Sequence, residues 1–367
     1  MRKIILLFGA VLAVASCGKS TEYAIDGQLE NRDFEGAQVY LVDIATREPV
    51  DSTLLSNGAF HFEGTVENPY VAYVVAVSDN NNAQTACVVE PGKIFVNLDS
   101  DSLAGTPLNE KLYNFTIASH EMDYALEQSI YLMLYRSATS EEDRHEAEAA
   151  YDSIDALRIA DLSKAAVETY NSNKDNVVGA YVLTRWASES HPEYAEAEKM
   201  LEGASDVVKN YAPLQTILSQ LQAIESTAAG KKYIDIEGIN FATGETGKLS
   251  QLIEGRVALV DFWASWCRPC RQEISENLIR IYKQYEKKGL QVVGVDVWDK
   301  IDQHKQAVEQ LGITYPQLID TTATKNATTT YGISGIPQIL LIGADGTIIA
   351  RDLRGADIEA AVIEALK

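Results

Sequence analysis

Cysteine and histidine, the usual nitrogen and sulfur ligands of zinc, are scarce in this 367-residue chain. The five histidines have no ligand spacing and stand at positions 61, 120, 145, 191 and 304. Of the four cysteines, only Cys267 and Cys270 form a close pair, and a zinc site would need a second pair of ligands. The sequence therefore predicts neither a metal centre nor a cofactor.

Basic residues are scarce in the first two-thirds of the chain. Only 15 of the 31 Lys and Arg residues precede residue 229, against 35 of the 53 Asp and Glu residues. Most of the formal net charge of −22 therefore lies there, whereas 16 basic and 18 acidic residues follow. This acidity argues against nucleic acid as a partner and favours a solvated surface.

The apolar run at the N-terminus, Ile4 to Val14, spans about 11 residues and is too short for an ordinary membrane span. It follows two basic residues, and Val14-Ala15-Ser16-Cys17 then resembles a lipobox. We therefore expect residues 1–16 to be a lipoprotein signal peptide and Cys17 to carry the lipid, outside the cytoplasm. Gly18-Lys19-Ser20 has no Asp beside the lipidated residue, which favours the outer membrane. The alternative is a plain secretory signal with an incidental cysteine.

One stretch organises the rest of the chain: an apolar run of strand length, Val257 to Trp263, leads into Cys267-Arg268-Pro269-Cys270. Apolar residues then return with the spacing of one buried helix face, at Ile274, Leu278, Ile281, Tyr282 and Tyr285. Pro269 suits a first helical turn. Cys267 is therefore expected at a helix N-terminus, where free N–H groups and the dipole stabilise a thiolate. The thiolate attacks disulfides, so the predicted chemistry is thiol–disulfide exchange.

The remaining cysteine, Cys87, lies in an apolar, strand-like run. A buried, inert thiol is its default interpretation. The Cys267/Cys270 pair then stands alone in an oxidising compartment, which favours redox use over metal binding.

The residues around this pair resemble the active-site motif of the thioredoxin superfamily. Asp261-Phe262-Trp263-Ala264 and Trp266-Cys267-Arg268-Pro269-Cys270 match that motif, and Gly335-Ile336-Pro337 is similar to the cis-proline loop. The segments Ile234 to Gly238 and Gly255 to Val257 are more like the membrane-tethered, extracytoplasmic TlpA/ResA branch. The resemblance covers about the last third of the chain.

The resemblance assigns roles to the residues of the motif. Cys267 would attack the substrate and Cys270 would resolve the mixed disulfide, with Trp266 and Pro269 as their neighbours in the motif. Arg268 would add a cation that lowers the pKa of Cys267; its alternative is a surface arginine of little effect. Pro337 would be the cis-proline that faces the disulfide, rather than a trans turn proline, and Ile336 would offer its backbone to an extended substrate.

Asp261 interrupts the apolar strand, where an ionised carboxylate is costly. It stands six residues before the first cysteine, the spacing of the buried proton-handling acid in thioredoxin. The alternative is a carboxylate at the strand edge that meets water. Two departures from the family pattern bear on the pKa of this acid. Ser275 stands where the family often has a helix-kinking proline, and Gly294 stands in place of the lysine that partners the acid in thioredoxin.

The composition changes along the chain predict three regions after the signal peptide. Residues 17–104 alternate β-branched and aromatic runs with turn signals and are expected to form a small antiparallel β-sandwich. Their pattern resembles the DUF4369 domain, whose name implies no chemistry. Residues 105–228 are expected to be helical, with a buried face that includes Ile130, Leu132, Leu134 and Tyr135, and to end in a linker. Residues 229–367 alternate strands and helices, as an α/β thioredoxin-like domain does.

These features predict a membrane-anchored, extracytoplasmic protein-disulfide oxidoreductase that acts as a reductant. Its substrates would be oxidised proteins, with an apocytochrome c as one candidate, and a membrane thiol–disulfide transporter would supply electrons. Two alternatives stay open. One is a disulfide oxidase or isomerase, and the other is a partner-binding scaffold whose redox pair is secondary.

Overall fold

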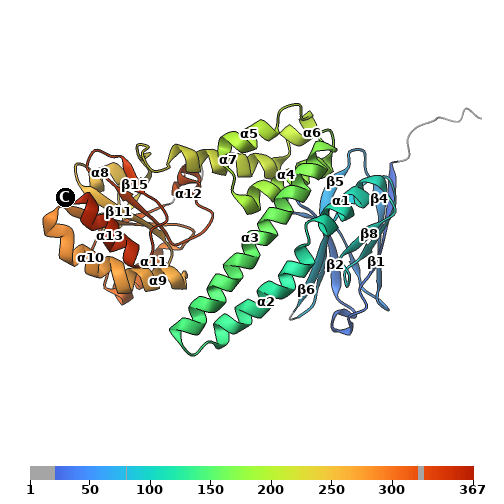
Figure 1. Cartoon of the computed structure of the whole chain (residues 1–367), viewed down its shortest axis with the longest axis horizontal. Coiled ribbons are helices and arrows are strands. Elements are labelled where there is room, and N and C mark those ends of the chain that lie inside the picture. Colours follow the sequence, from blue (N-terminus) through green and yellow to red (C-terminus); the bar gives the residue numbers. More distant parts are fainter. Residues whose placement is uncertain (1–20, 80, 321–325) are drawn as a thin grey trace, which may run out of the picture. The chain divides into compact units, whose positions relative to one another are not determined.

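The computed structural model describes residues 21–79, 81–320 and 326–367 (Figure 1). The expected signal peptide and Cys17 lie outside these residues. The chain forms two compact units, one made of the residues up to 186 with 205–213, the other of 187–204 with 214–367. Among the described helices, none is both long and apolar enough to cross a membrane.

The first unit begins with two four-stranded sheets, as the alternating strand pattern predicts. One sheet has the order β4-β1-β7-β8 and the other β3-β2-β5-β6. Buried and exposed residues alternate along β1 and β4, so that one face of that sheet is apolar. The strands are β1 (Glu22–Gln28), β2 (Gln38–Asp43), β3 (Pro49–Leu54), β4 (Ala59–Thr65), β5 (Tyr70–Val77), β6 (Asn82–Val89), β7 (Gly92–Asn97) and β8 (Ser102–Ala104), with a 3₁₀ turn η1 at Arg32–Phe34.

The first unit differs from the sequence prediction in one pairing. Its strands pair antiparallel except β1 and β7, which run parallel, with Tyr23 opposite Gly92 and Gln28 opposite Asn97. A parallel pair needs a long connection, and here five strands intervene. Local sequence patterns predict strands and hairpins but not such a distant pairing.

Helices follow from Pro107 onward, as predicted. They are α1 (Pro107–Ala118), α2 (Glu121–Ser137), α3 (Glu141–Asn171), α4 (Val177–Ser190), α5 (Tyr194–Met200), α6 (Asp206–Lys209) and α7 (Ala212–Ser226). Ser140 is the N-cap of α3, and its side chain accepts the backbone N–H of Asp143.

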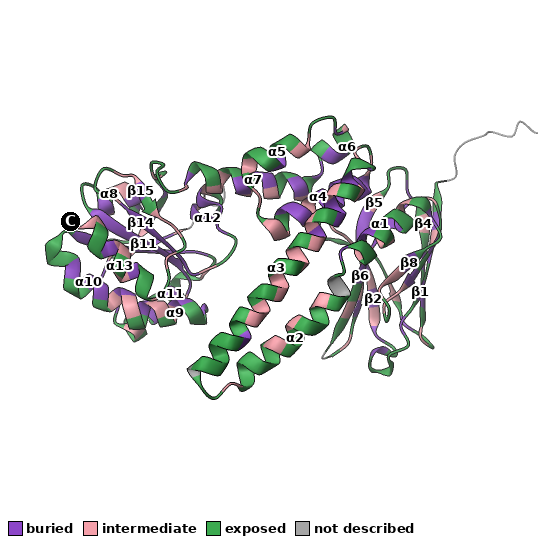
Figure 2. Ribbon diagram, viewed as in Figure 1, coloured by how far each residue is buried: buried purple, intermediate pink, exposed green. Residues whose placement is uncertain are grey.

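The prediction of a buried face on α2 is wrong. Ile130, Leu132, Leu134 and Tyr135 are 40 to 51% exposed, and the outer part of α2 is coloured exposed in Figure 2. The side chain of Tyr124 bonds to Asp161 of α3, and that of Gln128 bonds to Asp155. The helix therefore contacts α3 through polar groups and leaves much of its apolar surface in solvent.

The second unit contains a seven-stranded sheet of order β10-β9-β13-β12-β11-β14-β15. β11, β12 and β13 run parallel, and the other neighbours pair antiparallel. The α/β architecture predicted for the last third of the chain is confirmed. The strands are β9 (Glu237–Asn240), β10 (Thr246–Lys248), β11 (Val257–Trp263), β12 (Leu290–Asp296), β13 (Gln317–Ile319), β14 (Gln338–Ile342) and β15 (Ile348–Ala350).

Helices cover both faces of this sheet and create two cores. One core joins alternate β11 residues such as Leu259 and Trp263 to α10, α11, α13 and the Cys267/Cys270 pair. The other joins the intervening residues, such as Val260, to α8 and α12. The helical elements are α8 (Leu249–Ile253), α9 (Arg268–Glu273), a π-helical turn η2 (Ile274–Leu278), α10 (Ile279–Tyr285), η3 (Glu286–Lys288), α11 (Ile301–Leu311), α12 (Ala327–Tyr331) and α13 (Ala356–Ala365).

Candidate active site

Cys267 and Cys270 form a disulfide at the point where β11 leads into α9. Cys267 is the N-cap of α9, and its sulfur accepts the backbone N–H of Cys270 at 3.2 Å. Cys267 is 4% exposed and Cys270 is fully buried. The first sulfur therefore lies at the positive end of the helix, as the sequence pattern predicts, where a thiolate would be stabilised.

The segment Gly335-Ile336-Pro337 lies beside the disulfide. The Ile336–Pro337 peptide bond is cis, as the resemblance implied. The carbonyl oxygen of Ile336 is 3.7 Å from the sulfur of Cys267. The structure thus brings together the cysteines and the proline loop from positions almost 70 residues apart.

The other motif residues differ in exposure. Trp266 is 59% exposed, and its indole N–H donates to the carbonyl of Trp298 at 3.1 Å. Arg268 and Pro269 are exposed. Asp299, in the same loop as Trp298, accepts the backbone N–H of Ser265 at 2.6 Å. The loop after β12 therefore holds the turn that precedes the cysteines at two points.

Asp261 is completely buried in the middle of β11. Neither of its carboxylate oxygens has a hydrogen-bond partner among the described residues. Burial raises the pKa of Asp261 to about 8, against the opposing effect of Arg354 and with a further increase from Glu273. Since side chains alternate along a strand, Asp261 shares the face of Leu259 and Trp263, the face that packs on the core containing both cysteines.

Two charged residues near Asp261 were missed by the sequence analysis. The guanidinium of Arg354 donates to the carbonyls of Leu353 and Pro337. It therefore links the surroundings of Asp261 to the loop that contains the cis-proline. Glu273, at the end of α9, accepts the N–H of Gly355 at 3.0 Å. Arg354 lies 93 residues beyond Asp261 and no local pattern links them, whereas Glu273 could have been noticed as an acid one turn beyond Cys270.

The two departures from the family pattern have structural counterparts. A Cβ atom on Gly294, which pairs with Asp261, would lie 2.2 Å from the side-chain oxygen of Gln317. That oxygen accepts the indole N–H of Trp263 at 3.0 Å, so the glycine makes room for this bond. Ser275 lies in the π-helical turn, which distorts the helix where the family has a proline.

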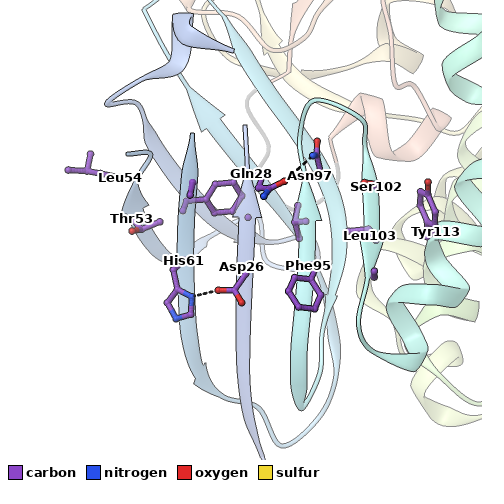
Figure 3. A pocket seen from close by; sticks show the side chains of 15 residues that line it. Asp26, Gln28, Thr53, Leu54, His61, Phe95, Asn97, Ser102, Leu103 and Tyr113 are labelled. Atoms are coloured by element: carbon purple, nitrogen blue, oxygen red, sulfur yellow. Dashed lines mark hydrogen bonds and ion pairs between the residues drawn. The ribbon is translucent and has the colours of Figure 1, made fainter. Parts of the chain in front are cut away.

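Two further features with reactive or titratable groups lie outside this site. Cys87 is a buried free thiol whose pKa is raised to about 12 by burial, so it is inert as expected. A pocket of about 860 Å³ lies on the β4-β1-β7-β8 sheet of the first unit, with Asp26, His61, Phe95 and Asn97 among its lining residues (Figure 3). The side chains of His61 and Asp26 are 2.8 Å apart, and this bond raises the pKa of His61. No cysteine lines this pocket.

Two parts of the chain match known protein families. Residues 229–351 match the AhpC/TSA family, and residues 23–112 match a domain of unknown function, DUF4369. A solved thioredoxin domain of a thiol-disulfide oxidoreductase from Bacteroides vulgatus is 30% identical, with a TM-score of 0.36; the match covers 38% of this chain and 99% of that one.

Two curated relatives carry names that describe an activity. The thiol-disulfide oxidoreductase ResA of Bacillus thuringiensis (strain Al Hakam) is 30% identical over 122 residues, which are 32% of this chain and 69% of the relative. The thiol:disulfide interchange protein CycY of Rhizobium leguminosarum bv. viciae is 31% identical over 156 residues, 42% of this chain and 75% of the relative. The chain belongs to the ResA-like family of thiol-disulfide oxidoreductases and is a protein-disulfide oxidoreductase with a thioredoxin-like domain.

Proposed function

We propose that this protein is a membrane-anchored, extracytoplasmic reductant of protein disulfides that acts through Cys267 and Cys270. The observation that supports this most directly is the position of the Cys267 sulfur, which accepts the N–H of Cys270 at the N-terminus of α9. The same backbone donor and helix dipole would stabilise a thiolate in the reduced form.

The reaction begins with the reduced pair. The thiolate of Cys267 attacks one sulfur of the substrate disulfide, and the other substrate sulfur leaves as a thiolate. Cys270 then loses its proton and attacks the sulfur of Cys267, which releases the second substrate thiolate. Two electrons pass to the substrate, and the Cys267–Cys270 disulfide seen in this structure is the product.

Asp261 is the group that receives the proton of Cys270 in this proposal. A carboxyl with a pKa of about 8 is partly ionised near neutral pH, so it can accept a proton and return it. Asp261→Asn should leave the first attack unchanged but slow the resolution step, so that mixed disulfides accumulate in stopped-flow experiments. An unchanged resolution rate between pH 6 and 9 would leave Asp261 without a part in catalysis.

The surroundings of the disulfide supply substrate contacts. The backbone of Ile336, next to the cis-proline Pro337 and 3.7 Å from the Cys267 sulfur, can align an extended polypeptide. Trp266 and Arg268, the residues on either side of Cys267 in the chain, are both exposed. Arg268 would further lower the pKa of the Cys267 thiol, and Trp266 offers an apolar surface to the substrate chain.

The cellular setting follows from the N-terminal sequence. Cys17 would carry a lipid and hold the protein at the outer membrane, and a membrane thiol–disulfide transporter would re-reduce the pair. Cys17→Ala should leave an uncleaved or mislocalised precursor. Normal maturation and membrane attachment of that variant would refute the anchor but not the redox chemistry.

Trapping identifies the substrate class, which includes an apocytochrome c as a candidate. Cys270→Ser cannot resolve mixed disulfides, so full-length protein should be recovered in dithiothreitol-sensitive adducts. The matched control Cys267→Ser should give none. If the adducts instead form only with Cys267→Ser, the nucleophile is Cys270. A reduction potential near that of DsbA, roughly −120 mV, would indicate a disulfide oxidase.

A second candidate function, partner binding by the first unit with a secondary redox role, is favoured by the pocket that contains Phe95 and His61. Insulin reduction separates the two. The reductase proposal expects turnover both by the full chain and by residues 229–367 alone. A folded but inactive fragment would favour the scaffold.

A further inference from the structure

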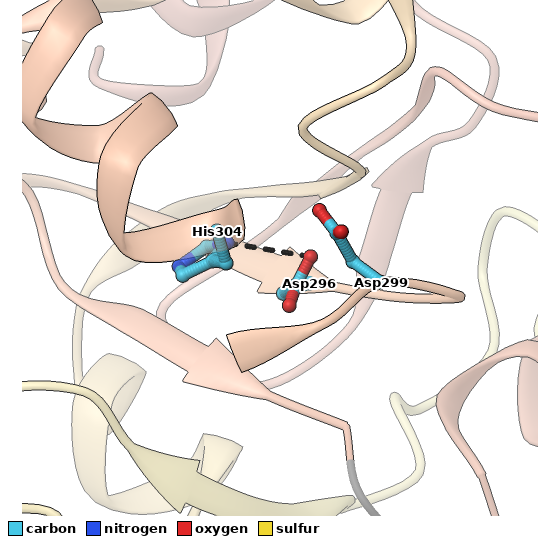
Figure 4. Close-up of side chains that lie close together, drawn as sticks. All are labelled: Asp296, Asp299 and His304. Atoms are coloured by element: carbon cyan, nitrogen blue, oxygen red, sulfur yellow. Dashed lines mark ion pairs between the residues drawn. The ribbon is translucent and has the colours of Figure 1, made fainter. Parts of the chain in front are cut away.

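Three side chains of types that can bind metals meet where β12 ends and α11 begins. Asp296 is the last residue of β12, Asp299 lies in the following loop and His304 lies in the first turn of α11 (Figure 4). One ligand atom from each of the three lies within 4.8 Å of the others. The Nδ1 atom of His304 and the Oδ1 atom of Asp296 are 3.3 Å apart.

Two of these side chains are buried and have polar atoms without a hydrogen-bond partner among the described residues. Asp296 is 1% exposed and His304 is fully buried. Asp296 Oδ1 and both ring nitrogens of His304 have no hydrogen-bond partner in the described part of the chain. Buried polar atoms are nearly always bonded, and each unbonded one destabilises the fold. The rings of Trp263 and Phe241, 5.0 and 5.4 Å from the imidazole between centroids, hold it in place.

The spacing of Asp296 and His304 fits a shared metal ion. Zinc binds histidine nitrogen at about 2.0–2.1 Å and carboxylate oxygen at about 2.0–2.2 Å, so tetrahedral ligand atoms lie roughly 3.3–3.5 Å apart. We propose that Asp296, Asp299 and His304 form a binding site for a divalent transition-metal ion of the zinc type. The ion would satisfy the unbonded oxygen of Asp296 and one nitrogen of His304.

The nature of the ligands selects the metal. An imidazole favours zinc and its neighbours over Mg²⁺ and Ca²⁺, which prefer six or more oxygen ligands. Asp299 is partly exposed, so water can complete the coordination. Its two oxygens each accept one backbone N–H, from Ser265 and Lys300, and each keeps a second lone pair for the ion. Because Ser265 lies two residues before Cys267, a bound ion would also fix the turn that leads to the disulfide.

Zinc binding to the oxidised full chain tests the site, because the disulfide removes Cys267 and Cys270 as competing ligands. Isothermal titration with Zn²⁺, checked by metal analysis after dialysis, should give one site per chain. Asp299→Asn and His304→Gln should weaken it at least 10-fold. His61→Gln is the matched control, because exposed His61 also lies near two carboxylates, those of Asp26 and Glu63. Affinity lost in the control but kept in the other two variants would overturn the proposal.

Because His304 is fully buried, its substitution can also affect folding. A second measurement therefore leaves His304 in place. Co²⁺ added to the oxidised wild-type chain should give visible bands of a tetrahedral site, and Zn²⁺ should displace it. Asp299 is partly exposed, so its substitution should disturb the fold least of the three. Asp299→Asn should abolish the Co²⁺ bands while near-UV circular dichroism stays unchanged. No such bands in the wild-type chain, or equal affinity for Ca²⁺ and Zn²⁺, would contradict a zinc-type site.

Discussion

The central strand β11 and the helix α2 use apolar and polar residues in opposite ways. All seven residues of β11 are buried, including Asp261, whose carboxylate has no hydrogen-bond partner among the described residues. On α2, Leu126 and Met133 are each 68% exposed, whereas Tyr124 donates to Asp161 of α3 at 2.5 Å. In the strand the apolar groups make the contacts and the acid is isolated; in the helix polar groups make contacts and apolar ones meet water.

The difference arises from what covers each element. β11 has helices on both faces and paired strands on both edges, so every side chain along it is removed from water. α2 packs mainly against one neighbour, α3. Burial of an apolar residue therefore contributes differently to the stability of the two elements, and only substitutions can measure it.

The largest expected effect concerns the isolated acid. Asp261 has a pKa of about 8 in the folded chain and 3.8 ordinarily, so between pH 4 and 8 the folded state keeps a proton that the unfolded state releases. Stability contributed by the neutral acid is therefore present below pH 4 and is lost as pH rises towards 8, by roughly 6 kcal/mol at most. Asp261→Asn removes this loss, so the variant should match the wild type at pH 4 and exceed it at pH 8.

Urea unfolding of the oxidised proteins at several pH values measures this difference. Tryptophan fluorescence is a suitable signal because Trp263, Trp266 and Trp298 all lie in the second unit. Parallel stability curves for the two proteins would mean that Asp261 is ionised or solvated in the folded state.

The second effect concerns packing in β11. Leu259 is fully buried in the core that contains the cysteines. Leu259→Ala should lower the free energy of unfolding by about 2–5 kcal/mol, from lost burial and the cavity left behind. The same urea titration measures it, and a change below about 1 kcal/mol would show that the core collapses around the gap.

A smaller effect is expected at Gly294. In Gly294→Ala the new Cβ would displace the side chain of Gln317 and break its bond to the Trp263 indole. The loss should be about 1–3 kcal/mol, from crowding and an unbonded buried N–H. Gly247→Ala, where the nearest atom is 3.3 Å away, is the control and should change the stability much less.

The smallest effect is expected on α2. Leu134 is 51% exposed, and Leu134→Ala should change the unfolding free energy by no more than about 0.5 kcal/mol. Circular dichroism during thermal unfolding is enough to check this. A loss as large as that of Leu259→Ala would show that α2 is covered in solution, for example by another chain.

Local sequence patterns predicted the elements around the disulfide closely. Strand-forming residues, Pro269 in the first helical turn and the apolar face beyond it placed Cys267 at the N-terminus of α9. Patterns failed where a contact joins distant residues or where burial depends on a partner. The parallel β1–β7 pair, the influence of Arg354 on Asp261 and the exposure of α2 are all of this kind.

The histidines illustrate the same limit. Their spacing gave no sign of a ligand set, yet the fold brings His304 to 3.3 Å from Asp296 because α11 folds back over the end of β12. A carboxylate eight residues before a histidine has no fixed geometry until the intervening turn is known.

The π-helical turn η2 sets the rotational phase of the helix that carries Cys270. Its wider ring adds a residue to one turn, so the segments before and after it are offset relative to a regular α-helix. Ile274 and Leu278 lie at the two ends of η2, and Ile281 and Tyr285 follow it in α10; all four face the same core. Removing one residue between positions 275 and 277 would turn the later segment by about 100°. The cysteines would keep their helix, but the helix would no longer match the sheet beneath it.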